Sequence, residues 1–62
     1  MTYAQVLVDM ANSEYRDALK SKDRGMDAAY TLALGRRRGI IMALEAMGVV
    51  PTYDVETGLY HI

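Results

Sequence analysis

A chain of 62 residues with no cysteine and a single histidine must fold without the covalent or metal links that hold many small domains together. Disulfides need cysteine pairs, and a structural zinc site needs a cluster of cysteine and histidine ligands. A domain of about 60 residues also buries only about 60% of the surface that its unfolded chain exposes. Self-association or well-packed helices remain as sources of stability, and of the two we favour self-association. We expect one domain over residues 1–62.

The first part of the chain predicts an amphipathic helix. Thr2 and Gln5 have the spacing of a capping box, which starts the helix at Tyr3 and gives a helical segment over residues 2–23. At about 100° per residue, one face carries the apolar side chains, and the opposite face is polar. The apolar face consists of Ala4, Leu7, Val8, Ala11, Tyr15, Ala18 and Leu19.

A second helix is predicted over residues 27–47. Gly25 suits the left-handed residue that ends the first helix, and Asp23 or Asp27 offers an N-cap for the second. Gly48, followed soon by the only proline of the chain, ends the second helix. One long kinked helix is the alternative, because a glycine inside a helix costs only about 1 kcal/mol relative to alanine.

Residues 52–62 predict a β-hairpin. Two short runs of β-prone residues flank Glu56, Thr57 and Gly58, and Gly58 can take the positive φ that a loop of three to five residues needs. An isolated hairpin is marginal in water, so we expect it to pack on the helices or on a partner. The predicted fold is mostly α: an antiparallel two-helix hairpin, then a small C-terminal β-hairpin, with dimerisation into a helical bundle.

Small side chains recur along one side of the second helix. Gly35 and Gly39 are four residues apart, and alanines continue the same side at seven-residue intervals. Leu34 and Ile41 lie beyond the face that the first helix can cover, so one partner helix cannot bury the whole apolar surface. The β-hairpin or a helix of the same chain could fill this side. We expect a subunit interface instead, formed by Ala28, Gly35, Gly39, Met42 and Ala46.

Three consecutive arginines, Arg36, Arg37 and Arg38, stand in the middle of this helix. Successive helical residues point about 100° apart, so the three cannot form one patch. Arg38 is expected on the polar face and Arg37 at its flank, where solvation is the ordinary interpretation and contact with nucleic acid the alternative. Arg36 falls within the apolar row of Ala29, Ala33, Ile40, Ala43 and Met47.

Glu14 interrupts the buried edge of the first helix as Arg36 interrupts the second. If the chain reverses near Gly25, residues whose numbers sum to about 50 lie at the same height, and these two do. We therefore expect a buried, bidentate ion pair between Glu14 and Arg36. The alternative is that both side chains extend to solvent.

All five aromatic residues are tyrosines, which are common where a surface is half buried against a partner. Tyr15 and Tyr30 are expected beside the core. The set expected to contact a partner protein is Tyr3, Tyr53 and Tyr60 together with Arg37 and Arg38.

Catalysis has little support in the sequence. His61 is next to the C-terminus, and neither Ser13 nor Ser21 has a recognisable catalytic partner. Metal binding by Asp54 and Glu56 with His61 would rest on three ligands in a short hairpin. We therefore predict no catalytic residue, no metal and no cofactor.

The net charge of −1 gives no broad positive field for phosphate backbones, and no uncharged stretch approaches the roughly 20 residues that span a bilayer. Neither nucleic acid nor membrane is thus indicated as a partner, and the chain is expected to be cytoplasmic. The leading hypothesis is a small non-enzymatic interaction protein that self-associates through the second helix and acts by binding another, unidentified protein.

In length and layout, the predicted helical hairpin resembles the Rop family, small RNA-binding proteins whose two-helix subunits dimerise into a four-helix bundle. This resemblance implies RNA binding by Arg37 and Arg38 of paired subunits as an alternative function. The C-terminal β-hairpin departs from that layout. Compact helical hairpins also resemble the accessory or inhibitor proteins of bacterial viruses. A structural subunit of a larger assembly is the third hypothesis.

Overall fold

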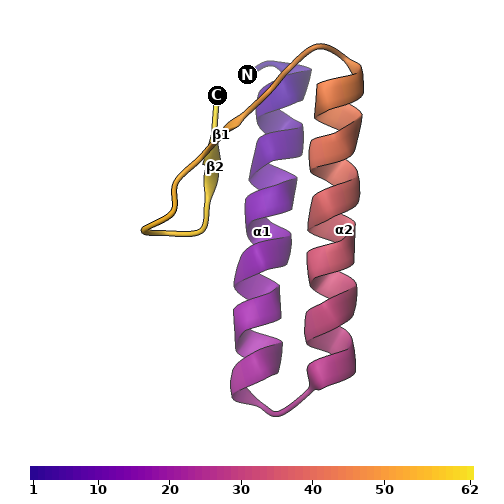
Figure 1. Cartoon of the computed structure of the whole chain (residues 1–62), viewed down its shortest axis with the longest axis vertical. Helices are drawn as coiled ribbons and strands as arrows, with labels where there is room; N and C mark the ends of the chain where they lie inside the picture. Colours follow the sequence, from indigo (N-terminus) through magenta and orange to yellow (C-terminus); the bar gives the residue numbers. More distant parts are fainter.

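The computed structural model describes all 62 residues as two helices followed by two short strands (Figure 1). Helix α1 spans Tyr3–Asp23 and helix α2 spans Asp27–Ala46, and the strands are β1 (Thr52–Tyr53) and β2 (Tyr60–His61). The helices run antiparallel along the 36 Å long axis, and the strand pair lies beside the half of the molecule that contains the N-terminus (Figure 1). The predicted fold class of a helical hairpin followed by a β-hairpin is confirmed.

Helix α1 begins where the sequence predicts. The Thr2 hydroxyl accepts a hydrogen bond from the backbone N–H of Gln5 at 3.1 Å, so Thr2 is the N-cap. The Gln5 side chain does not return to Thr2, as a full capping box requires. It donates instead to Asp9, one turn further along the helix, at 3.0 Å.

Both helices end in the same way. At the end of α1, Gly25 has a φ of 73°, and the next backbone N–H, that of Met26, reaches back to the carbonyl of Ser21. At the end of α2, Gly48 has a φ of 82°, and the N–H of Val49 reaches the carbonyl of Leu44. These are Schellman motifs, in which glycine supplies the left-handed residue. Two separate helices therefore form, and the single kinked helix does not.

The start of α2 differs from the prediction. Met26 is the N-cap residue and makes no capping hydrogen bond with its side chain, while Asp27 is already in the first turn of the helix. Neither Asp23 nor Asp27 is the N-cap, because the Schellman motif at Gly25 leaves only Met26 between that glycine and the start of α2. Asp27 still interacts favourably with the positive end of the helix dipole.

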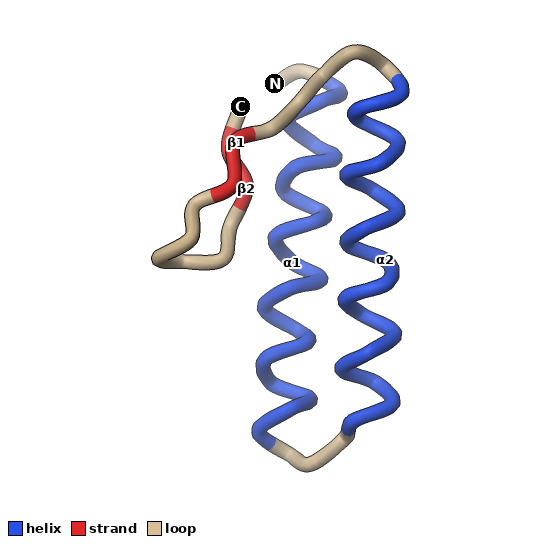
Figure 2. The backbone as a smooth tube through the Cα atoms, viewed as in Figure 1, coloured by secondary structure: helices blue, strands red, loops and turns tan.

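The β-hairpin pairs Thr52 with His61 and Tyr53 with Tyr60 in antiparallel register (Figure 2). Residues 54–59 connect the strands, a loop one residue longer than the longest expected. Gly58 has a φ of 76°, and its N–H donates to the carbonyl of Asp54 at 2.8 Å to close the turn.

The core between the helices is thin. The helices bury only five apolar side chains, and three of them are alanines: Val8, Ala11, Ala18, Ala33 and Leu44. Small side chains allow the two helices to pack closely but remove little apolar surface from water. Leu19, expected on the buried face of α1, keeps 42% of its surface exposed.

The inward face of α2 is rotated from the predicted row. Ala33 and Leu44 are buried, whereas Ala43 and Met47 are exposed. The centre of the buried face therefore lies near Arg37 rather than Arg36. A helix with apolar residues around most of its circumference does not define its inward direction by periodicity alone, which explains this difference.

Candidate functional site

Asn12 fixes the β-hairpin to α1. Its side-chain amide donates to the Tyr60 carbonyl at 3.0 Å and accepts from the Tyr60 N–H at 2.8 Å. The amide group thus satisfies both backbone groups of Tyr60 that point away from β1, as a neighbouring strand would. Asn12 is 8% exposed. Sequence reasoning missed this residue, although a polar side chain one turn after Val8 on the buried face requires a partner.

Arg37 holds the other end of β2. Its guanidinium carbon lies 4.6 Å from the centre of the Tyr15 ring and 5.7 Å from that of Tyr60, and Nη1 donates to the Gly58 carbonyl at 3.0 Å. Cations over aromatic rings are stabilised by the electrons of the ring face. The expectation of a solvated Arg37 is therefore wrong, because this side chain connects α2, α1 and the hairpin.

Gly58 cannot be replaced without moving Tyr15. A Cβ atom built at position 58 would lie 2.6 Å from Cζ of the Tyr15 ring. The residue is buried, and its backbone has a positive φ. Glycine is thus required here for two independent reasons, the backbone conformation and the close approach of the ring.

The structure brings Glu14 and Arg36 together, with Arg36 Nε 3.0 Å from Glu14 Oε2. Their side chains nevertheless keep 25% and 53% of their surface exposed, and the contact uses one nitrogen and one oxygen. The expected buried, bidentate geometry is therefore wrong, because the rotation of α2 places Arg36 at the edge of the helix interface. Arg38, the last of the triplet, is exposed and has no ion-pair partner in the chain.

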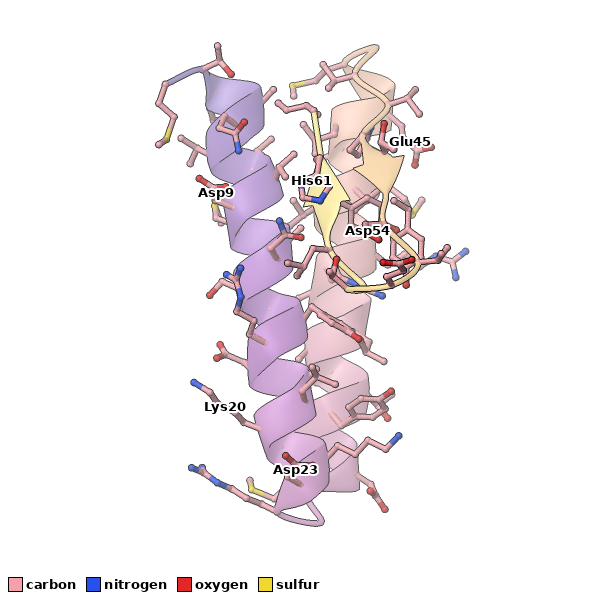
Figure 3. All side chains as sticks on the ribbon, turned by 90° about the vertical axis from the view of Figure 1, so that its left-hand side faces the viewer. Asp9, Lys20, Asp23, Glu45, Asp54 and His61 are labelled. Carbon is pink, nitrogen blue, oxygen red and sulfur yellow. The ribbon has the colours of Figure 1, made fainter.

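A groove of about 530 Å³ runs between α2 and β2. Leu34 and Ile41, both half-buried, supply aliphatic surface along it. Its remaining lining residues are Arg37, Arg38, Met42, Glu45 and Tyr60. Figure 3 shows Glu45 on α2 near the level of His61 on β2. The groove thus combines apolar surface with two guanidinium groups and one carboxylate.

The residues expected at a subunit interface all lie on the exposed side of α2. Ala28, Gly35, Gly39 and Ala46 are exposed, and Met42 keeps 57% of its surface accessible. No other part of the chain would touch a Cβ atom at either helix glycine. Neither α1 nor the β-hairpin fills this side. The structure contains one chain and so does not test whether a second copy does.

The tyrosines divide between the inside and the outside of the molecule. Tyr3 and Tyr53 are exposed, at 69% and 46%, as a partner contact requires. Tyr60 is half-buried, with its ring centre 5.1 Å from that of Tyr53 and its other side toward Arg37. Tyr60 and Arg37 are therefore already engaged within the chain.

The hairpin loop contains one perturbed carboxyl group. The backbone N–H of Glu56 donates to Asp54 at 2.9 Å and holds the pKa of Asp54 below its ordinary value. Hydrogen bonds from Thr57 and the nearby His61 act in the same direction. His61 Nε2 lies 4.0 Å from Asp54 Oδ2, and no group of three or more potential metal ligands is present.

Neither helix is both long and apolar enough to cross a membrane. Comparisons with protein-family models, with curated proteins and with solved structures find no match for this chain.

Proposed function

We propose that this chain is a non-enzymatic interaction protein that self-associates through α2 and acts by binding another protein. The observation that carries the proposal is a continuous exposed row along α2, which we call the α2 stripe. Its spacings alternate between four and three residues, as in the seam of a coiled coil. The α2 stripe consists of Ala28, Leu32, Gly35, Gly39, Met42 and Ala46, with Leu32 60% exposed.

The α2 stripe is symmetric about position 37, which supports an antiparallel pair of α2 helices. In such a pair, Gly35 would face Gly39 of the partner subunit, and Leu32 would face the partner's Met42. Residues of similar size then meet, and a two-fold axis makes the same contacts twice. Antiparallel packing also aligns opposite ends of the helix dipoles.

The thin core supports self-association on energetic grounds. Buried apolar surface contributes about 25 cal/mol per Å², and the two helices bury only five apolar side chains. Leu32 and Met42 remain in water in the single chain, with 60% and 57% of their surface exposed. A second copy on the α2 stripe would add to the buried apolar surface that stabilises the fold.

The proposed location and role of the protein are those expected of a small interaction protein. It would act in the cytoplasm, as an accessory or inhibitor protein of a bacterial virus or as a small subunit of a larger assembly. RNA binding by the arginines of α2 has less support from the structure than from the sequence. Arg36 is paired with Glu14 and Arg37 holds the hairpin, so Arg38 is the only one of the three consecutive arginines that is free for phosphate.

The test replaces both helix glycines of the α2 stripe by glutamine. In a lone chain, the double variant Gly35→Gln/Gly39→Gln should stabilise α2, because glycine is about 1 kcal/mol less favourable than good helix formers in a helix interior. In a dimer, the same side chains would hold the helices apart. We expect sedimentation equilibrium to give a dimeric mass for the wild type at micromolar concentrations and a monomeric mass for the variant.

Ser13→Gln on the exposed side of α1 is the matched control and should leave the dimer intact. The melting temperature of the wild type should also rise with protein concentration, because folding and association are linked. A monomeric wild type with a melting temperature independent of concentration would contradict self-association. Affinity capture with and without nuclease would then separate a protein partner from RNA.

A further inference from the structure

The groove between α2 and β2 follows α2 for about three turns. Its lining residues on α2 span about 16 Å of the helix axis, at 1.5 Å per residue. They recur at alternating intervals of three residues and one: Leu34, Arg37, Arg38, Ile41, Met42 and Glu45. This is the pattern of the face that a helix presents to a second helix packed along it. The groove therefore has the length and the residue spacing of a binding site for a helix.

The middle of the groove carries two positive charges that the chain does not neutralise. Arg37 is half-buried, and it contacts two tyrosine rings and the Gly58 carbonyl, none of which carries a negative charge. Arg38 is exposed, and neither arginine forms an ion pair. Glu45, the one acidic residue of the lining, lies two turns beyond Arg38, about 10 Å along the helix axis. The charge of the groove thus favours carboxylates near Arg37 and Arg38.

Aliphatic side chains lie on both sides of the two arginines. Leu34 is one turn before them and Ile41 is one turn after them, and both are half-buried. The two residues are two turns apart, which equals the distance between residues seven positions apart on a neighbouring helix. The complementary surface is a helix with aliphatic residues at positions i and i+7 and acidic residues at i+3 and i+4.

We infer that the groove binds an acidic amphipathic helix of another protein. The aliphatic residues of that helix pack on Leu34 and Ile41, and its carboxylates pair with Arg37 and Arg38. The inference rests on the proposed binding of another protein and names the chemistry of that partner. Nucleic acid would supply the negative charge, but its phosphates offer no aliphatic side chains for Leu34 and Ile41.

The groove is on a different side of α2 from the α2 stripe. Leu34 and Gly35 point about 100° apart, as do Arg38 and Gly39, and Met42 lies at the border between the two surfaces. Binding in the groove and dimerisation therefore use largely different side chains and can be measured separately.

The test uses a stapled helical peptide with two leucines seven residues apart and two glutamates between them. Fluorescence anisotropy should show that the wild type binds this acidic peptide about tenfold more tightly than a peptide with lysines in place of the glutamates, because like charges repel. Arg38→Glu should weaken binding of the acidic peptide about tenfold and strengthen binding of the lysine peptide. Replacing the two leucines by serines should weaken binding to the wild type.

Arg16→Glu is the matched control, because it makes the same change in charge at an exposed position of α1. It should leave the affinity for the acidic peptide within about twofold of wild type, as surface changes away from a binding site do. Circular dichroism verifies that both variants fold, and changes in the amide NMR signals of α2 and Tyr60 should locate the peptide in the groove. The changes made in the peptide test the groove without altering the chain.

Equal affinity for the acidic and the lysine peptide, or no binding of the acidic peptide, would overturn the inference. An effect of Arg38→Glu no larger than that of Arg16→Glu would do the same, as would displacement of the acidic peptide by an RNA hairpin. Sedimentation equilibrium separates these results from dimerisation. A dimeric wild type that fails the peptide test leaves self-association through α2 intact, whereas a monomeric wild type that passes it contradicts self-association alone.

Discussion

At the scale of single residues, the three arginines of α2 show how one step along a helix changes the role of a side chain. Arg36 pairs with Glu14 at the edge of the helix interface, Arg37 holds the hairpin, and Arg38 remains free. Successive side chains point about 100° apart, so each of the three meets a different environment. The sequence alone predicts that the three side chains separate, but it assigns the inward position to Arg36 rather than to Arg37.

The Glu14–Arg36 pair should contribute little to stability. With 53% of the Arg36 side chain in water, solvent screens the interaction, and exposed pairs contribute about 0.2–1 kcal/mol. Glu14→Gln and Arg36→Met should each lower the free energy of unfolding by less than about 1 kcal/mol, with a coupling energy in the same range. Urea denaturation of the double-mutant cycle measures this coupling. A coupling of about 3 kcal/mol or more would show that the pair is desolvated.

At the scale of elements, the stability of the β-hairpin depends on its contacts with the two helices. Two-stranded hairpins are marginal alone, and these strands have two residues each. Asn12 and Arg37 anchor β2 from the two helices, and Gly58 lets the turn approach Tyr15. The hairpin is therefore held by contacts with α1 and α2 as much as by its own backbone pairing.

Gly58→Ala should destabilise the chain more than Gly25→Ala. Both glycines have a positive φ near 75°, so alanine carries a similar backbone penalty of about 1–2 kcal/mol at each. Position 25 has open space for the new methyl group, but at position 58 it would meet the Tyr15 ring at 2.6 Å. We expect Gly58→Ala to displace that ring and weaken its stacking with Arg37.

Chemical denaturation of the two alanine variants compares the free energies of unfolding, and the aromatic NMR signals of Tyr15 report the ring displacement. Gly25→Ala serves as the control for the backbone penalty alone. Equal losses of stability, with unchanged Tyr15 signals in Gly58→Ala, would mean that the ring does not restrict position 58.

At the scale of the whole molecule, local signals predict the elements, whereas the way in which they pack depends on contacts between distant residues. Thr2, Gly25, Gly48 and Gly58 act within a few residues of themselves, so the helix ends and the hairpin turn can be read from the sequence. The clamp of Arg37 on the hairpin and the pairing of Asn12 with Tyr60 join residues 21 and 48 positions apart. No local pattern defines such contacts.

The rotation of α2 could not be predicted for a related reason. Apolar residues surround most of this helix, and the small difference in burial between alternative orientations does not select one. The docked hairpin contributes to that selection, since Arg37 must point toward Gly58 and Tyr15. The candidate interaction residues on the outer side of α2 could be identified from their small size and their spacing. They stay exposed when the helix is rotated by one position.

Asn12 joins the hairpin to the helices, so its removal tests whether the molecule unfolds as one unit. Asn12→Ala leaves the Tyr60 N–H and carbonyl without their partners, and an unsatisfied buried backbone group costs about 1–3 kcal/mol. A core of five apolar side chains leaves the helices little independent stability. We expect the free energies of opening, measured by amide hydrogen exchange in the hairpin and in α2, to fall together.

Ser13→Ala, at the next and exposed position of α1, should change neither set of amides by more than about 0.5 kcal/mol. Loss of protection confined to residues 51–62 in Asn12→Ala would show instead that the hairpin opens as a separate unit. Measuring the variants at several protein concentrations separates this coupling from dimerisation. Protection gained from a second copy changes with concentration, whereas protection gained from Asn12 within the chain does not.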